Sequence, residues 1–125
     1  MKGRPFRARM GFALAGIHAG WTREASFRSQ ARLAAAALLA LLLLRPAPIW
    51  WGLVAICCAI VLALELVNSA MEAVIDLLHP GIHPSIKAAK DMLAGAVLVM
   101  SVAALVVAVA MVAANGPHFL EEIGL

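Results

Sequence analysis

Three of the chain's seven acidic residues, Glu65, Glu72 and Asp76, lie close together within one long apolar segment. An advance of 100° per residue along a helix places them, together with Asn68 and Ser69, within about 100° of arc. These five side chains form one stripe, here called the polar stripe, on an otherwise apolar helix. Ionisable groups inside a membrane are energetically costly and usually functional. Carboxylates in this setting could accept a proton or bind a cation.

The depth of the polar stripe spans two environments. Glu65 follows Ile49, the expected start of the helix, by 16 residues, which is roughly 24 Å of rise through a hydrocarbon core about 30 Å thick. We therefore expect Glu65 just inside the cytoplasmic boundary, where the polar head of a lipid lies. Glu72 lies about 10 Å further toward the cytoplasm, within reach of a water-soluble phosphate donor. The alternative is a polar seam that only joins helices by hydrogen bonds.

The elements that carry the stripe are expected to be membrane helices. Hydrophobic residues make up 64% of the 125 residues and charged residues 14%, whereas soluble domains have about 25% charged residues. The apolar runs predict an all-α membrane protein with one domain over residues 1–125. We expect three transmembrane helices, with Arg45-Pro46-Ala47-Pro48 breaking the chain between the first two and Asn115-Gly116-Pro117 ending the third. The spans are about 29–45, 49–78 (with a cytoplasmic extension) and 92–114.

The N-terminal segment, about residues 5–28, is expected to lie on the membrane as an amphipathic surface helix. Its apolar residues gather on one face of a helix while arginines interleave with them. If this helix is unbroken, Glu24 falls within the apolar face and needs a partner, a metal or a polar cavity. Trp21 and Arg28 are expected to contact lipid. The apolar face consists of Phe6, Met10, Ala13, Leu14, Ile17 and Trp21.

The distribution of basic residues predicts the orientation in a bacterial inner membrane. Seven of the ten lysines and arginines lie at or before residue 32, two lie in the second loop, and only Arg45 lies in the first loop. The excess of positive charge on cytoplasmic segments then puts the N-terminus and residues 79–91 in the cytoplasm and the C-terminus in the periplasm. The net charge of +3 is too small to indicate nucleic acid as a partner.

Other familiar sites are not indicated. The sequence has neither a phosphate-binding G-x-x-x-x-G-K-[ST] loop nor a G-x-G-x-x-G fingerprint. Cys57 and Cys58 are neighbours on a helix and point in different directions, so the interpretation is two small apolar side chains without a disulfide. His79 and His83 are separated by Pro80-Gly81, which argues against a helical pair of metal ligands.

Three stretches together resemble the small prokaryotic diacylglycerol kinases. Residues 65–76 match the signature E-x-x-N-S-A-x-E-x-x-x-D, and residues 24–28 match E-x-x-F-R at the end of the surface helix. Lys90-Asp91, followed by Gly95-Ala96-Val97-Leu98, resembles the K-D opening of the family's third helix. The three stretches occur in the family's order and cover nearly the whole chain.

This resemblance implies a lipid kinase that works as a homotrimer with active sites between subunits. MgATP would donate its γ-phosphate to the primary hydroxyl of diacylglycerol, which gives phosphatidic acid. Lysine would act as a compact positive charge on phosphate, and Mg²⁺ prefers a few carboxylates together with phosphate oxygens. By position in the motifs, the resemblance implies that Glu65 is the catalytic base and that Glu24 and Glu72 are the metal ligands. Glu24 and Glu72 also belong to the nucleotide site, to which Lys90 and Asp91 are added. The supporting polar residues are Asn68, Ser69 and Asp76.

Two alternatives to this function stay open. Residues 84–87 resemble the sister branch that phosphorylates undecaprenol, whereas Asn68-Ser69-Ala70 favours the diacylglycerol branch. Gln30 and Ala94 also depart from the family, because relatives can carry an acid at the first position and a small polar residue at the second. The alternative from a different class is a small assembly or transporter subunit whose polar stripe lines an ion path. That alternative leaves Glu24 and Lys90 without a role.

Overall fold

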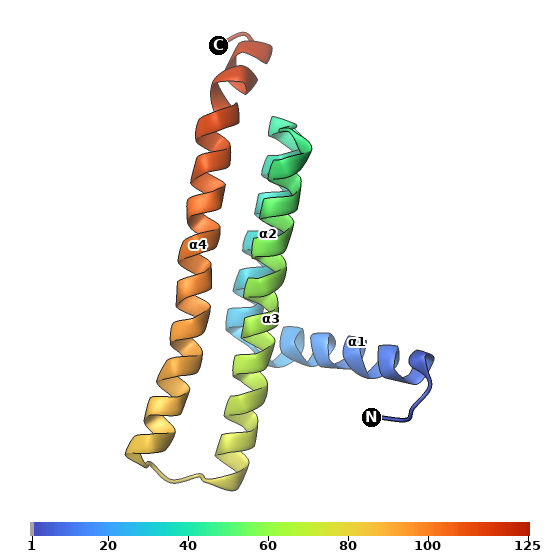
Figure 1. Cartoon of the computed structure of the whole chain (residues 1–125), viewed down its shortest axis with the longest axis vertical. Helices are drawn as coiled ribbons and strands as arrows, with labels where there is room; N and C mark the ends of the chain where they lie inside the picture. The colour runs from blue at the N-terminus through green and yellow to red at the C-terminus, as the bar shows by residue number, and fades with distance from the viewer. Residues whose placement is uncertain (1) are drawn as a thin grey trace.

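Four α-helices make up the part of the chain that the structure, a computed structural model, describes, which is residues 2–125. Figure 1 shows α2, α3 and α4 running side by side, with α1 lying crosswise at the foot of α2. α2, α3 and α4 are each long and apolar enough to cross a membrane. The prediction of an all-α membrane protein with an N-terminal helix before three spans is confirmed. The helices are α1 (Phe6–Arg23), α2 (Ala25–Leu44), α3 (Pro48–Leu78) and α4 (Pro84–Glu122).

The first helix ends earlier than the sequence predicted. Glu24 has φ −115° and ψ 109°, an extended conformation that ends α1 and begins α2. The prediction that the surface helix runs to about residue 28 is therefore wrong, and the unbroken helix that would put Glu24 on the apolar face does not form. Residues 25–28 instead form the first turn of α2. The chain changes direction at Glu24, from α1, which lies across the foot of the bundle, to α2, which runs along it. The 20 residues of α2 rise about 30 Å, the thickness of a hydrocarbon core.

The break between α2 and α3 follows the sequence prediction. Arg45 takes a left-handed conformation with φ 46°, and its N–H donates to the carbonyl of Leu41. Pro46 cannot continue the helix because it has no N–H to donate. Pro48 then occupies the first turn of α3, where a missing N–H costs nothing. α3 continues without interruption through the whole polar stripe to Leu78.

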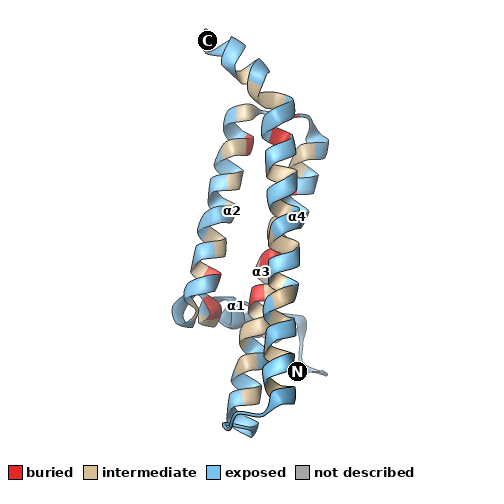
Figure 2. Ribbon diagram, turned by 90° about the vertical axis from the view of Figure 1, so that its left-hand side faces the viewer, coloured by how far each residue is buried: buried red, intermediate tan, exposed pale blue. Residues whose placement is uncertain are grey.

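The last helix is longer at both ends than the predicted span. His83 caps its start, because its Nδ1 accepts a hydrogen bond from the Ser85 N–H at 3.1 Å. Residues 84–91 are therefore the first turns of α4 and not a loop. Pro117 lies inside the helix, so the prediction that Asn115-Gly116-Pro117 ends it is wrong. Figure 2 shows the last turns of α4 bending away from the helix axis toward the side on which α2 lies, as expected beyond an internal proline.

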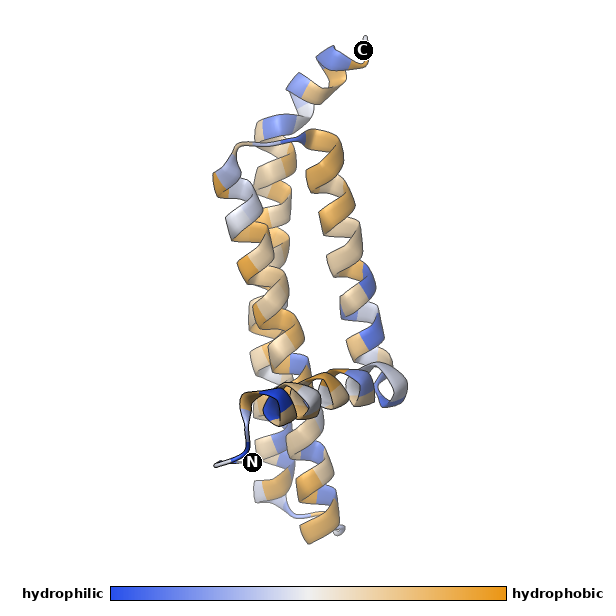
Figure 3. Ribbon diagram, turned by 90° about the vertical axis from the view of Figure 1, so that its right-hand side faces the viewer, coloured by the Kyte–Doolittle hydropathy of each residue, from blue (hydrophilic) through white to orange (hydrophobic). Residues whose placement is uncertain are grey.

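A small core joins the three long helices at the end far from α1. Leu41, Val54 and Met111 are buried together, with Trp50 and Trp51 packed against them. The buried residues lie between the helices in Figure 2, and most large apolar side chains are exposed. Figure 3 shows that the middle of the long helices is hydrophobic and that hydrophilic residues gather toward the α3–α4 turn. An apolar exterior of this kind is what lipid contact requires.

Candidate active site

Glu65 is the buried polar centre of the bundle. It lies on α3, and only 4% of its surface is exposed. The hydroxyl of Ser26, in the first turn of α2, donates a hydrogen bond to Glu65 Oε2 at 2.9 Å. Burial of a carboxylate is costly unless it is hydrogen-bonded, and this bond supplies one partner. The arrangement holds one carboxylate oxygen in place at the level where α1 meets the bundle.

The position of α1 next to Glu65 depends on Gly20. This residue is buried, and a Cβ added to it would lie 2.5 Å from Leu66 Cδ2 and 3.5 Å from Phe27 Cγ. The absence of a side chain therefore lets α1 approach the residue that follows Glu65 on α3. Phe27 itself is buried and fixes the start of α2. These contacts set the corner at which the half-buried Glu24 lies.

The other end of the polar stripe is paired with α4. Lys90 Nζ lies 2.5 Å from Asp76 Oδ1, and their side chains are 35% and 63% exposed. Glu72, which is half-buried, also attracts the ammonium of Lys90. Asp91 bonds to Lys87 at 2.6 Å on the same helix. The structure thus pairs Asp76 with Lys90, near enough to Glu72 for its charge to act on the ammonium, whereas Asp91 is paired with Lys87.

The middle of the stripe contains an unpaired polar atom. Asn68 Oδ1 is buried and has no hydrogen-bond partner within residues 2–125. Ser69, its neighbour, is partly buried. A buried acceptor without a donor costs free energy, and native proteins have few of them. Asn68 is therefore a residue that a ligand or another subunit could satisfy.

Trp21 and Arg28, the predicted lipid contacts, lie at the α1–α2 corner. Arg28 Nη1 donates to the backbone carbonyl of Trp21 at 2.7 Å. The guanidinium of Arg32 lies 5.9 Å from the centre of the Trp21 ring, within the range of a cation–π contact. The corner is thus braced by two arginines, and lipid binding by Trp21 and Arg28 stays a prediction.

Comparisons with known proteins show the family to which the sequence is similar. Residues 11–112 match the family model of the prokaryotic diacylglycerol kinases, a range that includes α2, α3 and every predicted site residue. The chain belongs to the prokaryotic diacylglycerol kinase family. The expectation drawn from the three sequence stretches is thereby confirmed.

Individual members of the diacylglycerol kinase family show how far the similarity extends. The chain is 32% identical over 84 residues to a diacylglycerol kinase of Helicobacter pylori, which is 67% of this chain and 66% of that protein. It is 35% identical over 97 residues to a diacylglycerol kinase of Synechocystis, 77% of this chain and 55% of that protein. The chain thus spans between about half and two thirds of these two relatives. It is also 37% identical over 92 residues to an undecaprenol kinase of Bacillus subtilis, 69% of this chain and 75% of that protein.

A metal site in this diacylglycerol kinase family member would need ligands from outside the chain. Within residues 2–125, no three His, Cys, Asp or Glu side chains come together around one point. Mg²⁺, however, is commonly held by one or two carboxylates together with substrate phosphates. Glu24 and Glu72 form no salt bridge in the described part of the chain. Both carboxylates are of the right chemistry, and their role as metal ligands stays a prediction.

Sequence reasoning missed two residues of the site. Ser26 lies within the E-x-x-F-R stretch, yet its hydrogen bond joins residues 39 positions apart along the chain. Gly20 has no side chain that could do chemistry, and the structure gives it a packing role. Neither role has a local sequence signal, because both depend on how α1 and α2 pack against α3. Cys57 and Cys58 are free thiols, as predicted.

Proposed function

We propose that the chain is an ATP-dependent lipid kinase that transfers the γ-phosphate to the hydroxyl of diacylglycerol and gives phosphatidic acid. The observation that carries this proposal is Glu65, a buried carboxylate of a membrane helix that Ser26 holds at the level of α1. If α1 lies in the membrane surface, Glu65 is at the depth of a lipid head group. A proton acceptor at that depth is what phosphorylation of a lipid hydroxyl requires.

Glu65 acts in this proposal as the base for the acceptor hydroxyl. Ser26 binds Oε2, and Oε1 accepts the proton of the lipid hydroxyl as its oxygen bonds to the γ-phosphorus. The bond between that phosphorus and the bridging oxygen of ATP breaks, and ADP leaves. The fixed carboxylate gives alignment as well as basicity, because its rotation is restrained by the bond from α2.

The far end of the polar stripe receives the nucleotide. Lys90 is bound to Asp76 in an exposed ion pair, and exposed pairs contribute little to stability. Phosphate oxygens carry more negative charge than one carboxylate, so they can replace Asp76 as the partner of the Lys90 ammonium. Glu24 and Glu72 would hold Mg²⁺, which when bound neutralises the charge on the transferring phosphate. Asp91 is paired with Lys87, and its part in nucleotide binding rests on its place in the K-D stretch.

Assembly as a homotrimer in the bacterial inner membrane, with the N-terminus in the cytoplasm, is part of the proposal. The buried and unpaired oxygen of Asn68 supports an additional partner at the stripe. The number three comes from the family resemblance.

An undecaprenol kinase is the second candidate function. It is favoured by the relative from Bacillus subtilis, of which the chain covers 75%. The two candidates share the base, the nucleotide end and the chemistry, and they differ in the acceptor alcohol. A transporter would use the polar stripe as an ion path and would transfer no phosphate.

One assay separates these functions. Purified protein in mixed micelles is incubated with MgATP and, in parallel, with diacylglycerol, undecaprenol or no lipid, and phosphate transfer to lipid is followed. We expect phosphatidic acid to form fastest. Faster phosphorylation of undecaprenol would make the second candidate the function. Failure to phosphorylate either alcohol, by a preparation that remains folded and binds ATP, would contradict a lipid kinase.

A further inference from the structure

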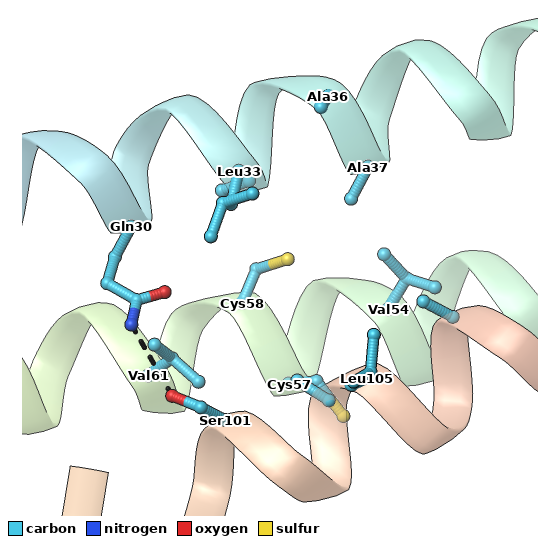
Figure 4. A pocket seen from close by; sticks show the side chains of 13 residues that line it. Gln30, Leu33, Ala36, Ala37, Val54, Cys57, Cys58, Val61, Ser101 and Leu105 are labelled. Atoms are coloured by element: carbon cyan, nitrogen blue, oxygen red, sulfur yellow. Dashed lines mark hydrogen bonds between the residues drawn. The ribbon is translucent and has the colours of Figure 1, made fainter. Parts of the chain in front are cut away.

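A cavity of about 460 Å³ lies between α2, α3 and α4, on the side of Glu65 that leads into the bundle. Figure 4 shows Gln30, Val61 and Ser101 at one end and Ala37 and Val54 at the other. Small apolar side chains line most of it. A cavity of this character offers water few hydrogen bonds, so an apolar occupant is favoured.

The polar end of the cavity consists of two side chains. Gln30 Nε2 donates to Ser101 Oγ at 3.4 Å, across the gap between α2 and α4. This distance is at the outer limit of a hydrogen bond, so the bond is weak and easily exchanged. The carboxamide of Gln30 can both donate and accept, which suits it to a neutral polar group.

The polar end lies about one helical turn from the proposed base. Gln30 is one helical turn beyond Ser26 on α2, and Val61 is one turn before Glu65 on α3. Four residues of helix rise about 6 Å. The Gln30 amide is therefore about one turn deeper in the membrane than the hydrogen bond between Ser26 and Glu65. A lipid whose hydroxyl meets Glu65 would place the next part of its head group at this level.

We propose that the cavity binds an acyl chain of an ester-linked glycerolipid and that Gln30 recognises the ester carbonyl beside the reacting hydroxyl. This inference rests on the proposed lipid kinase function. In diacylglycerol five bonds separate the free hydroxyl oxygen from the nearest ester carbonyl oxygen, a span of up to about 6 Å. That span equals the rise between the two polar levels. A prenol has no ester at this position, so Gln30 would favour glycerolipid over prenol.

The walls of the cavity allow such a chain to enter from the bilayer. Leu33 and Leu105 belong to its lining, and each is 64% exposed on the outer surface of the bundle. A chain can therefore slide in sideways between α2 and α4 without leaving the hydrocarbon. The other possible occupant is a side chain from a second copy of the protein, which the test below separates from lipid.

The test compares an ester lipid with an ether lipid of the same length. KM and kcat are measured for dioctanoylglycerol and for its dioctyl ether analogue, which lacks the carbonyl oxygens. We expect the KM for the ester to be about 3- to 10-fold lower than the KM for the ether, which is the contribution of one neutral hydrogen bond. Gln30→Leu should remove this preference by raising KM for the ester alone. Ser29→Leu, a polar residue beside it that does not line the cavity, is the matched control and should keep it.

Binding without turnover keeps this inference separate from the proposed function. Native mass spectrometry of Glu65→Gln protein, with and without Gln30→Leu, reports retention of the two lipids whether or not phosphate is transferred. Stronger retention of the ester that depends on Gln30 supports the inference even if no kinase activity is found. Equal retention of ester and ether, or equal loss of both in Gln30→Leu, overturns it. A change in oligomer mass with no change in ester preference assigns the cavity to a neighbouring copy and also overturns it.

Discussion

Replacing Glu65 by glutamine tests the central residue with little change in shape. The glutamine oxygen can still accept the bond from the Ser26 hydroxyl, so the contact between α2 and α3 is retained. A bond to a charged acceptor is replaced by a bond to a neutral one, which costs roughly 1 kcal/mol of stability. The same change removes a charge from a site that is only 4% exposed, which offsets part of this loss. We therefore expect a folded protein with nearly unchanged thermal stability.

The effect on catalysis should be much larger than the effect on stability. A general base contributes typically about 10²–10⁴-fold to rate, while alignment of the substrates remains after its loss. We expect Glu65→Gln to lower kcat at least about 10²-fold and to leave the KM for ATP unchanged. Turnover, nucleotide affinity and unfolding temperature are measured on one preparation, with Glu121→Gln, an exposed glutamate at the C-terminal end of α4, as control. Near-normal turnover of Glu65→Gln would refute the assignment of the base, and loss of activity through unfolding would favour a packing role.

Four further predictions concern the surroundings of this carboxylate. Glu24→Gln and Glu72→Gln should each raise the Mg²⁺ concentration for half-maximal activity more than the KM for lipid, and an unchanged Mg²⁺ titration in both would remove them as ligands. Lys90→Met should raise the KM for ATP about tenfold or more, as expected for a lost charge-assisted bond to phosphate, and leave the KM for lipid unaltered. Gly20→Leu should destabilise the protein by about 1–3 kcal/mol through overpacking against α3. Gly16→Leu, where an added Cβ meets nothing within 4 Å, should not destabilise the protein. Equal unfolding temperatures of the two variants would argue against the close approach of α1 to α3 at Gly20. The detergent-corrected mass should be that of a trimer, and an active monomer would contradict a site shared between subunits.

Local sequence patterns predicted the long helices and the alignment of the polar stripe. Long apolar runs can form only helices in lipid when they are not part of a closed barrel, and Pro46 and Pro48 mark the break between two of them. The helical period then determines that Glu65, Glu72 and Asp76 share one face of α3. These inferences need no tertiary information, and the structure agrees with them.

Features that depend on packing could not be predicted. No glycine or proline stands next to Glu24 to signal the end of α1, and the break follows from the change of direction between two helices. At Pro117 the sequence predicted an end of the helix that the structure does not have, because a helix can lose one hydrogen bond at a proline and bend rather than end. The bond from Ser26 to Glu65 joins two helices that the sequence does not align with each other. The pairing of Lys90 with Asp76 likewise depends on how the α3–α4 turn closes.

The continuation of α3 beyond α1, visible in Figure 1, has a consequence for product inhibition. From Glu65 to its end at Leu78, α3 rises about 20 Å, and this length carries Glu72 and Asp76. Before the proposed reaction the acceptor lipid has a neutral head group, which these carboxylates do not repel. Afterwards it carries a phosphate beside the same negative charges. In the proposed reaction, once ADP and Mg²⁺ have left, the part of α3 from Glu65 to Leu78 would therefore bind the product less tightly than the substrate. Turnover would then continue in a membrane where the product accumulates.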